Sequence, residues 1–203
     1  MVATKLKYPC MYRNYGCREI YGFDLIGGHQ EKCQYKPQSC LVNKLNIEHC
    51  TWTGISSSMK SHLKQAHPSM CKEYYGRFQG SIHISGVTPD TGRDIFIFVG
   101  NDIFCSRSKI TNDLFYSVLL YIGPAADAVK YRCKLELFNK ENKEALTVTR
   151  LARSVNEDLS EDHCVKIAPY QLNCFRNENN EVDFSMEIFT AEHNFPHCLY
   201  LKT

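Results

Sequence analysis

The apolar and polar positions in the second half of the chain alternate with a period of two. Apolar side chains occupy every second position of Tyr131–Leu137, and Arg132, Lys134 and Glu136 stand between them. The segment Val182–Ile188 shows the same complete alternation. Successive side chains of a β-strand point to opposite faces of a sheet, so this pattern predicts strands with one buried face and one face in water.

Other apolar segments in this region are continuous. Ile95–Val99 and Phe115–Ile122 are short, rich in aromatic residues and bounded by glycine or polar clusters, which favours buried strands. Shorter strands are expected at Ile82–Ile84 and Leu146–Val148. Turn-forming residues separate these segments at 89–92, 100–102, 123–124 and 177–180. Many short strands with frequent turns predict an antiparallel sandwich or barrel.

The helical signal is concentrated in the first third of the chain. Residues Ser56–His67 begin with serines that suit a helix N-terminus and continue with good helix formers. Pro68 follows directly and predicts the end of this helix.

Composition fits a folded chain of one or two domains. The 203 residues are 43% hydrophobic and 12% aromatic, and the formal net charge is +2. Residues 1–75 carry 10 Lys and Arg against 5 Asp and Glu, whereas the remainder carries 14 against 17. The basic excess of the first part is compatible with an ordinary solvated surface, an acidic protein partner or nucleic acid.

Eleven cysteines demand either disulfides or metal sites. The N-terminal segment has no apolar stretch typical of a signal peptide, and no run of 18 apolar residues predicts a membrane span. We therefore expect a chain with reduced thiols in the cytoplasm, with the nucleus as a second compartment, and no membrane partner.

Cysteine and histidine residues recur at nearly the same spacing twice. Cys10-x6-Cys17-x11-His29-x3-Cys33 is followed by Cys40-x9-Cys50-x11-His62-x4-His67. Each quartet offers the four ligands of a closed tetrahedral zinc site, so the spacing predicts two structural zinc ions. His29 and Cys33 are four residues apart and would share one face of a helical turn.

Two ligand assignments in the second quartet have competitors. His49 is adjacent to Cys50, and Cys71 lies just beyond His67. Cys50 is preferred because the x11 gap to His62 repeats the first quartet. His67 is preferred because Pro68 separates it from Cys71.

Candidate catalytic residues are scarce, so whether the chain is an enzyme is uncertain from these residues. The sequence has no Gly-rich phosphate loop, no G-x-S-x-G motif and no coherent carboxylate pair. Four of the other cysteines fit core positions, namely Cys105, Cys133, Cys174 and Cys198. Histidines without ligand spacing are His83, His193 and His197.

The paired quartets, followed by a β-rich segment of about 125 residues, resemble the seven in absentia (Siah) family of ubiquitin ligases. The resemblance continues through Tyr35–Cys40, Cys50–Gly54, Met59–Leu63, Phe115–Gly123, Tyr131–Leu137, Arg153–Val155 and Cys164. It implies a mainly β chain in which two small zinc-binding α+β units precede a TRAF-like antiparallel β-sandwich, usually dimeric through the sandwich. The implied domains are a short lead (1–9), a first finger (10–34), a second finger (35–71) and the sandwich (76–203).

The resemblance also implies a function and partners. The family transfers ubiquitin to bound proteins, which marks them for proteasomal degradation, and its fingers and sandwich bind substrates and adaptors. One of its binding modes adds an extended peptide to a sheet edge. The corresponding strand here is Asp94-Ile95-Phe96-Ile97-Phe98-Val99, which could equally be an internal core strand.

One family feature is missing from these 203 residues. Family members carry a RING domain before the first finger, with eight Cys or His ligands, whereas the nine residues before Cys10 contain neither type. The chain could be a fragment, a product that lost its RING or a sequence with a mispredicted start. We expect it to engage a ubiquitin-conjugating enzyme only through a RING-bearing partner, as a homodimer or a heterodimer with family members.

Three functions therefore stand beside one another. The first is the substrate-recognition part of a Siah-type ligase, and the second is a competitor that sequesters substrates without ubiquitinating them. The third is a nucleic-acid-binding zinc-finger protein. The gaps of x6 and x9 depart from DNA-reading fingers, and the helix 56–67 offers only Lys60 and Lys64, which argues against nucleic acid.

Overall fold

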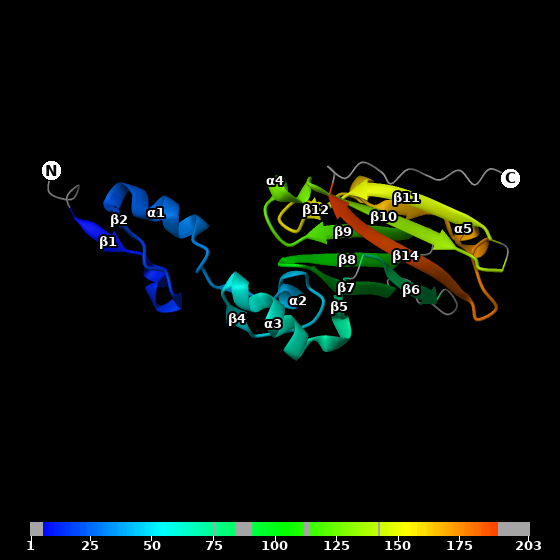
Figure 1. The fold of residues 1–203 in the computed structure, drawn as a ribbon, viewed down its shortest axis with the longest axis horizontal. Helices are drawn as coiled ribbons and strands as arrows, with labels where there is room; N and C mark the ends of the chain where they lie inside the picture. The colour runs from blue at the N-terminus through cyan, green and yellow to red at the C-terminus, as the bar shows by residue number, and fades with distance from the viewer. Residues whose placement is uncertain (1–5, 75, 84–90, 112–113, 142, 191–203) are drawn as a thin grey trace. The chain divides into compact units, whose positions relative to one another are not determined.

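The structure is a computed structural model that describes residues 6–74, 76–83, 91–111, 114–141 and 143–190. The chain divides into two compact units, Met1–Ser69 and Met70–Thr203 (Figure 1). Among the described residues, no helix combines the length and apolar character needed to cross a membrane.

The first unit contains two small α+β subdomains. Its first 30 residues or so hold a two-stranded sheet, a 3-10 helix and an α-helix: β1 (Lys7–Pro9), η2 (Met11–Tyr15), β2 (Ile20–Gly22) and α1 (Phe23–Lys32). The second subdomain has the same order of elements: β3 (Gln38–Ser39), α2 (Leu41–Lys44), β4 (Thr53–Gly54) and α3 (Ser56–Ala66). The predicted helix 56–67 is confirmed, and the 3-10 helix η3 (Pro68–Met70) follows it.

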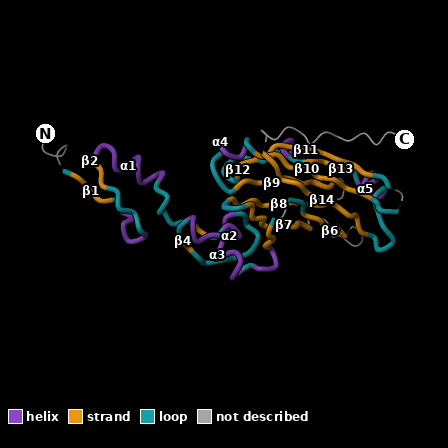
Figure 2. The backbone as a smooth tube through the Cα atoms, in the orientation of Figure 1, coloured by secondary structure: helices purple, strands orange, loops and turns teal. Residues whose placement is uncertain are grey.

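The second unit is built from two sheets (Figure 2). The four-stranded sheet has the order β11 (Ala145–Leu151), β10 (Tyr131–Phe138), β14 (Glu181–Thr190) and β6 (Phe78–His83). The six-stranded sheet has the order β12 (Arg153–Ser154), β9 (Phe115–Tyr121), β8 (Asp102–Ile110), β7 (Thr91–Val99) and β5 (Cys71–Glu73), and β13 (Val165–Ile167) also pairs with β9. Short helices fill the connections: α4 (Ala125–Ala128), η4 (Glu161–His163) and α5 (Pro169–Asn173).

The alternating segments form strands as predicted. On β10 the side chains of Cys133, Leu135 and Leu137 are buried, and those between them are half-buried. On β14 the same alternation buries Val182 and Phe184. These residues join Ile95, Ile97 and Phe104 of the six-stranded sheet in one hydrophobic core, so the two sheets form the predicted β-sandwich.

The continuous apolar run at 95–99 lies in β7, where residues on both faces of the strand are buried. Phe96 and Phe98 are no more than 1% exposed, although their side chains alternate with those of the core residues Ile95 and Ile97. Burial on both faces explains why the sequence of this strand shows no alternation.

One end of the sandwich carries a polar cluster. The hydroxyls of Tyr121 and Tyr131 donate to the two carboxylate oxygens of Asp102, at 3.1 Å and 2.7 Å. Burial, together with this carboxylate, raises the pKa of both tyrosines to about 12. The cluster therefore pairs three half-buried polar groups beside the buried ring of Phe104.

Several details differ from the sequence-based expectations. Cys71, placed in the range of the second finger, lies in β5 of the six-stranded sheet, because its backbone pairs with that of Phe96. Cys174, expected in the core, is exposed at the end of α5. Cys198, His193 and His197 lie outside the described residues, as do Ile84 of the expected strand 82–84 and residues 89 and 90 of the expected turn 89–92.

We predict that Phe104→Ala destabilises the sandwich by about 3–5 kcal/mol, because the phenyl ring is fully buried and contacts both cluster tyrosines. Urea unfolding followed by circular dichroism measures this change. Tyr170→Ala is the matched control: this ring is 72% exposed, and its removal should change the free energy of unfolding by no more than about 0.5 kcal/mol. Equal destabilisation by both variants would contradict the assigned core.

Candidate metal centres

Local structure brings the first quartet together from the ends of two elements, η2 and α1. Cys10 is the N-cap of η2, and Cys17 follows Gly16, whose φ of 111° ends that helix in the left-handed region. His29 lies in the last turn of α1, and Cys33 is its C-cap. A left-handed φ is tolerated by glycine far better than by other residues, so Gly16 allows the sharp turn that aims Cys17 at the other ligands.

The ligand atoms of this cluster have the spacing of a zinc tetrahedron. All four lie within 4.8 Å of one another, with 3.8 Å between the Sγ atoms of Cys10 and Cys33 and 3.4 Å from Cys17 Sγ to His29 Nε2. Typical zinc–ligand bonds imply about 3.8 Å between two sulfurs and about 3.6 Å between sulfur and nitrogen. The residues therefore fit one zinc ion.

The second quartet is assembled in the same way. Cys40 is the N-cap of α2, Cys50 lies in the following loop, His62 is on α3 and His67 is the C-cap of α3. Cys40 Sγ is 3.5 Å from His67 Nε2, and Cys50 Sγ is 3.6 Å from His62 Nε2. These distances also fit one zinc ion, and all four ligand atoms lie within 4.8 Å of one another.

The competing ligand residues lie elsewhere. Within the described residues, the second cluster contains Cys50 and His67 but neither His49 nor Cys71. Cys71 is held in β5 by its pairing with Phe96, and His49 is exposed.

An aromatic ring packs against one histidine ligand of each cluster. Trp52 stacks on His62 with 4.2 Å between ring centroids and 4° between ring planes. Tyr21 lies 4.6 Å from His29 in a tilted arrangement. A Cβ added at Gly54 would come within 2.3 Å of the Trp52 ring, so this glycine leaves room for the stacked tryptophan.

Glu48 orients a ligand of the second cluster. Its Oε1 is 2.6 Å from His67 Nδ1, while His67 Nε2 faces the cluster. A carboxylate on the outer ring nitrogen fixes the histidine tautomer and strengthens the inner nitrogen as a ligand.

Burial sets the protonation of the ligand groups. It raises the pKa of the Cys17 thiol to about 11, although a hydrogen bond from the Glu19 N–H lowers it. Burial likewise raises the pKa of Cys40, opposed by the Val42 and Asn43 N–H groups. It lowers the pKa of His62, which favours the neutral imidazole that binds metal. Since zinc binds thiolates, loading these sites releases protons.

The arrangement supports a structural and not a catalytic role. Each cluster supplies four protein ligands, which fills the tetrahedron and leaves no position for a substrate or water. Zinc at these sites would crosslink short segments that are otherwise far apart in the sequence.

The predicted peptide-binding strand lies in the sandwich. Ile95, Phe96, Ile97 and Phe98 are buried, and Val99 is half-buried. Asp94 accepts two hydrogen bonds from Arg107, at 2.7 Å to Nε and 3.3 Å to Nη2. The side chains of this strand are thus largely occupied within the protein, and contact with a peptide would have to use its backbone.

Sequence reasoning missed the residues that support the ligands. Tyr21, Trp52 and Glu48 belong to no ligand spacing, and their roles depend on how the chain returns past each cluster. The only available signal was that Trp52 and Gly54 follow Cys50 closely, which marks a tight turn but not a stacked ring.

We predict that His29→Ala lowers the zinc content from two ions to one per chain and leaves the sandwich folded, because the variant removes a ligand of the first cluster only. Metal analysis and thermal melts of the β signal measure both effects. His49→Ala, which alters an exposed histidine outside both clusters, should keep two ions. Loss of cooperative β melting in His29→Ala would contradict the independence of the two units.

We predict that Glu48→Ala weakens zinc binding at the second cluster by about 10-fold, because His67 loses its outer-ring partner. The Glu48 side chain is 48% exposed, so its removal should leave little cavity. Competition with a chromogenic chelator measures the affinity, and the first cluster serves as the internal control. Unchanged release of both ions would contradict the role assigned to Glu48.

Comparison with known proteins extends these observations. Residues 1–77 match the family model described as "Sina, zinc finger". The chain is 25% identical over 169 residues to E3 ubiquitin-protein ligase siah-1 of Caenorhabditis briggsae, covering 78% of this chain and 37% of that protein. It is 24% identical over 182 residues to E3 ubiquitin-protein ligase SIAH2 of Homo sapiens, covering 78% and 49%. It is 38% identical over 66 residues to E3 ubiquitin-protein ligase DIS1 of Oryza sativa subsp. japonica, covering 32% and 21%.

The chain thus spans between about a fifth and a half of the length of these curated relatives. The match to the family model covers both metal clusters, and the longer alignments include most of the chain. The chain therefore combines a zinc-finger region that matches the Sina model at residues 1–77 with similarity, over most of its length, to proteins named as Siah E3 ubiquitin-protein ligases.

Proposed function

We propose that the chain is the target-recognition part of a Siah-type ubiquitin ligase, which holds proteins while ubiquitin is transferred to them for degradation. The observation that carries this proposal is the extent of the similarity. Relatives named as E3 ubiquitin-protein ligases align over 169 and 182 residues, whereas the finger model stops at residue 77. The similarity therefore includes the sandwich, in addition to the fingers.

The chemistry of the chain supports a binding role. Both metal clusters are closed, and the described residues contain no third cluster of Cys, His, Asp and Glu side chains that could hold a metal ion. A RING requires eight such ligands. We propose that a RING-bearing protein, including a family member paired with this chain as a dimer, brings the ubiquitin-conjugating enzyme.

The free part of one strand edge supports a site for extended target segments. β7 pairs with β8 along its whole length, Thr91 to Val99. On its other side, β5 pairs with it only from Phe96 to Phe98. Among the described residues, no strand lies on that side of Thr91–Ile95, so backbone groups there are available to an added strand.

This arrangement narrows the expected site. The C-terminal half of the strand predicted to bind peptide is occupied by β5, so the open edge lies at 91–95 and not at 96–98. Arg93 lies on this edge, and its Nη1 donates a hydrogen bond of 3.4 Å to the carbonyl oxygen of Ser81 on β6. An added strand would run past a polar rim formed by the two sheets of the sandwich.

We predict that proteins retained by the immobilised, zinc-loaded chain become ubiquitinated when activating enzyme, conjugating enzymes, ubiquitin and a RING-bearing Siah relative are added together. Without that relative, the chain should form no ubiquitin conjugates, since its described metal clusters are both fingers. Immunoblotting for ubiquitin measures the outcome. Conjugates formed by the chain alone would contradict the need for a partner. Protection of the retained proteins would instead support a competitor that sequesters targets.

A pair of proline variants tests the edge. The N–H groups of neighbouring strand residues point to opposite sides of the strand. One of the two variants Gly92→Pro and Arg93→Pro therefore interrupts the pairing with β8, and the other removes a hydrogen-bond donor from the open edge. The second kind should reduce target retention while the sandwich melts normally. Arg93→Ala keeps the N–H and should retain targets. Normal retention by both proline variants would exclude strand addition at 91–95.

A further inference from the structure

The two fingers differ in how much apolar surface they expose. Of the nine large hydrophobic side chains found exposed in the described residues, six lie in the first finger and its lead, and none lies in the second finger. The six are Leu6, Met11, Tyr15, Ile20, Phe23 and Leu25. Helix α1 buries none of its residues, whereas α3 buries Met59 and Leu63. Exposed apolar side chains are therefore concentrated in the first finger and its lead.

A surface hollow of about 470 Å³ lies in this finger. It is lined by two groups: Gly16, Cys17, Arg18 and Glu19 from the turn after η2, and His29, Cys33, Gln34 and Tyr35 from the end of α1 and beyond. Its volume is within the range of sites that hold small ligands or single peptide side chains. Three of the lining residues belong to the metal cluster, so zinc binding would hold the hollow in shape.

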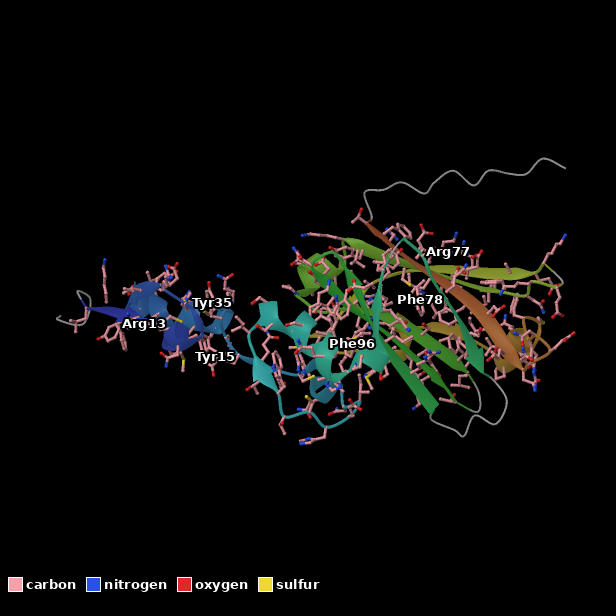
Figure 3. All side chains as sticks on the ribbon, turned by 60° about the horizontal axis from the view of Figure 1, so that its bottom comes forward. Arg13, Tyr15, Tyr35, Arg77, Phe78 and Phe96 are labelled. Carbon is pink, nitrogen blue, oxygen red and sulfur yellow. The ribbon has the colours of Figure 1, made fainter. Side chains whose placement is uncertain are left out.

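Tyr35 forms the aromatic part of the hollow. Its ring packs against the three buried cysteines of the cluster and lies over Gly16, where an added Cβ would be 3.0 Å from Cε1. Figure 3 shows Tyr15, Tyr35 and Arg13 on this finger. A ring held in place in this way offers a rigid apolar contact at little entropic cost.

Arg18 is the cation of the hollow, which Glu19 also lines. The Arg18 side chain is exposed, and neither Arg18 nor Arg13 forms an ion pair with any residue in the part of the chain that the structure describes. Burial, together with the nearby Glu19 carboxylate, raises the pKa of Tyr21, whose ring packs on His29. Because Arg18 is exposed and has no ion-pair partner among the described residues, its guanidinium can bind a carboxylate from outside the chain.

We propose that this hollow is a second protein-binding site, which takes a short segment that carries an apolar side chain next to an aspartate or glutamate. The apolar side chain packs on Tyr35, and the carboxylate accepts hydrogen bonds from the Arg18 guanidinium. The site is separate from the strand edge at 91–95 and does not depend on the proposed ligase role.

The charge of the finger favours a peptide over a nucleic acid. Residues 6–34 carry four Lys and Arg side chains against three carboxylates, and Glu19 itself lines the hollow. A nucleic-acid groove needs a continuous basic track along the phosphates, whereas one or two carboxylates need only a local cation.

The test uses the full zinc-loaded chain on a positional-scanning array of ten-residue synthetic peptides. We expect selection of Asp or Glu beside Leu, Phe or Met. The array is repeated with Arg18→Glu, and with Lys7→Glu as the matched control, since Lys7 is exposed on β1 and does not line the hollow. Arg18→Glu should exchange the acidic preference for Lys or Arg, and Lys7→Glu should leave it unchanged.

Fluorescence anisotropy with the best acidic peptide completes the test. Arg18→Glu should weaken binding by about 5-fold or more, because an attractive exposed charge pair becomes a repulsive one. Zinc content of two ions per chain verifies that the variant is folded, and the edge variants Gly92→Pro and Arg93→Pro should bind this peptide normally. Identical preferences in the wild type and Arg18→Glu would overturn the proposal. So would a 12-nucleotide single-stranded DNA that binds more tightly than the peptide and depends on Arg18.

Discussion

Metal ligation is the constraint on which the first part of the molecule depends. In the first finger, the buried residues among 6–34 are the three cysteine ligands themselves, and the helix that carries His29 buries nothing. A segment of this size cannot bury enough apolar surface to offset its conformational entropy. Zinc binding, worth roughly 10–16 kcal/mol in finger peptides, replaces the missing core. The cysteine cluster is thus both the core of this finger and its metal site.

The second finger meets the same constraint with additional burial. It buries Leu41, Val42, Met59 and Leu63, stacks Trp52 on His62 and braces His67 with Glu48. The two fingers therefore share the x11 spacing between cysteine and histidine but differ in how much apolar burial adds to the stability that metal binding provides. A finger stabilised almost entirely by its ligands can leave its apolar side chains at the surface, where they are free to contact another protein.

The predictability of each part follows from the range of the interactions that shape it. Ligand spacing and period-two alternation are local, so the two quartets and strands such as β10 and β14 could be read from the sequence. β8 escaped detection because its Ser106–Ser108 segment interrupts the apolar pattern with polar residues, among them Arg107, which pairs with Asp94 across the sheet. β5 and β13 are three residues each and exist only through pairing with distant strands. The supporting contacts of Tyr21, Trp52 and Glu48 are likewise tertiary.

Of these unpredicted features, the short length of β5 bears most directly on the proposed site for target segments. β7 has nine residues. If it were the last strand of its sheet, its whole edge would be open to a peptide. If its neighbour were equally long, no part of that edge would be open. β5 covers three positions and leaves Thr91–Ile95 open on that side among the described residues. Since the side chains of Ile95–Phe98 are buried, any selectivity at this edge must come from neighbouring surface groups. A target segment would then gain affinity from backbone hydrogen bonds to β7 and specificity from these surface groups. Affinity and specificity would thus come from different atoms of the site.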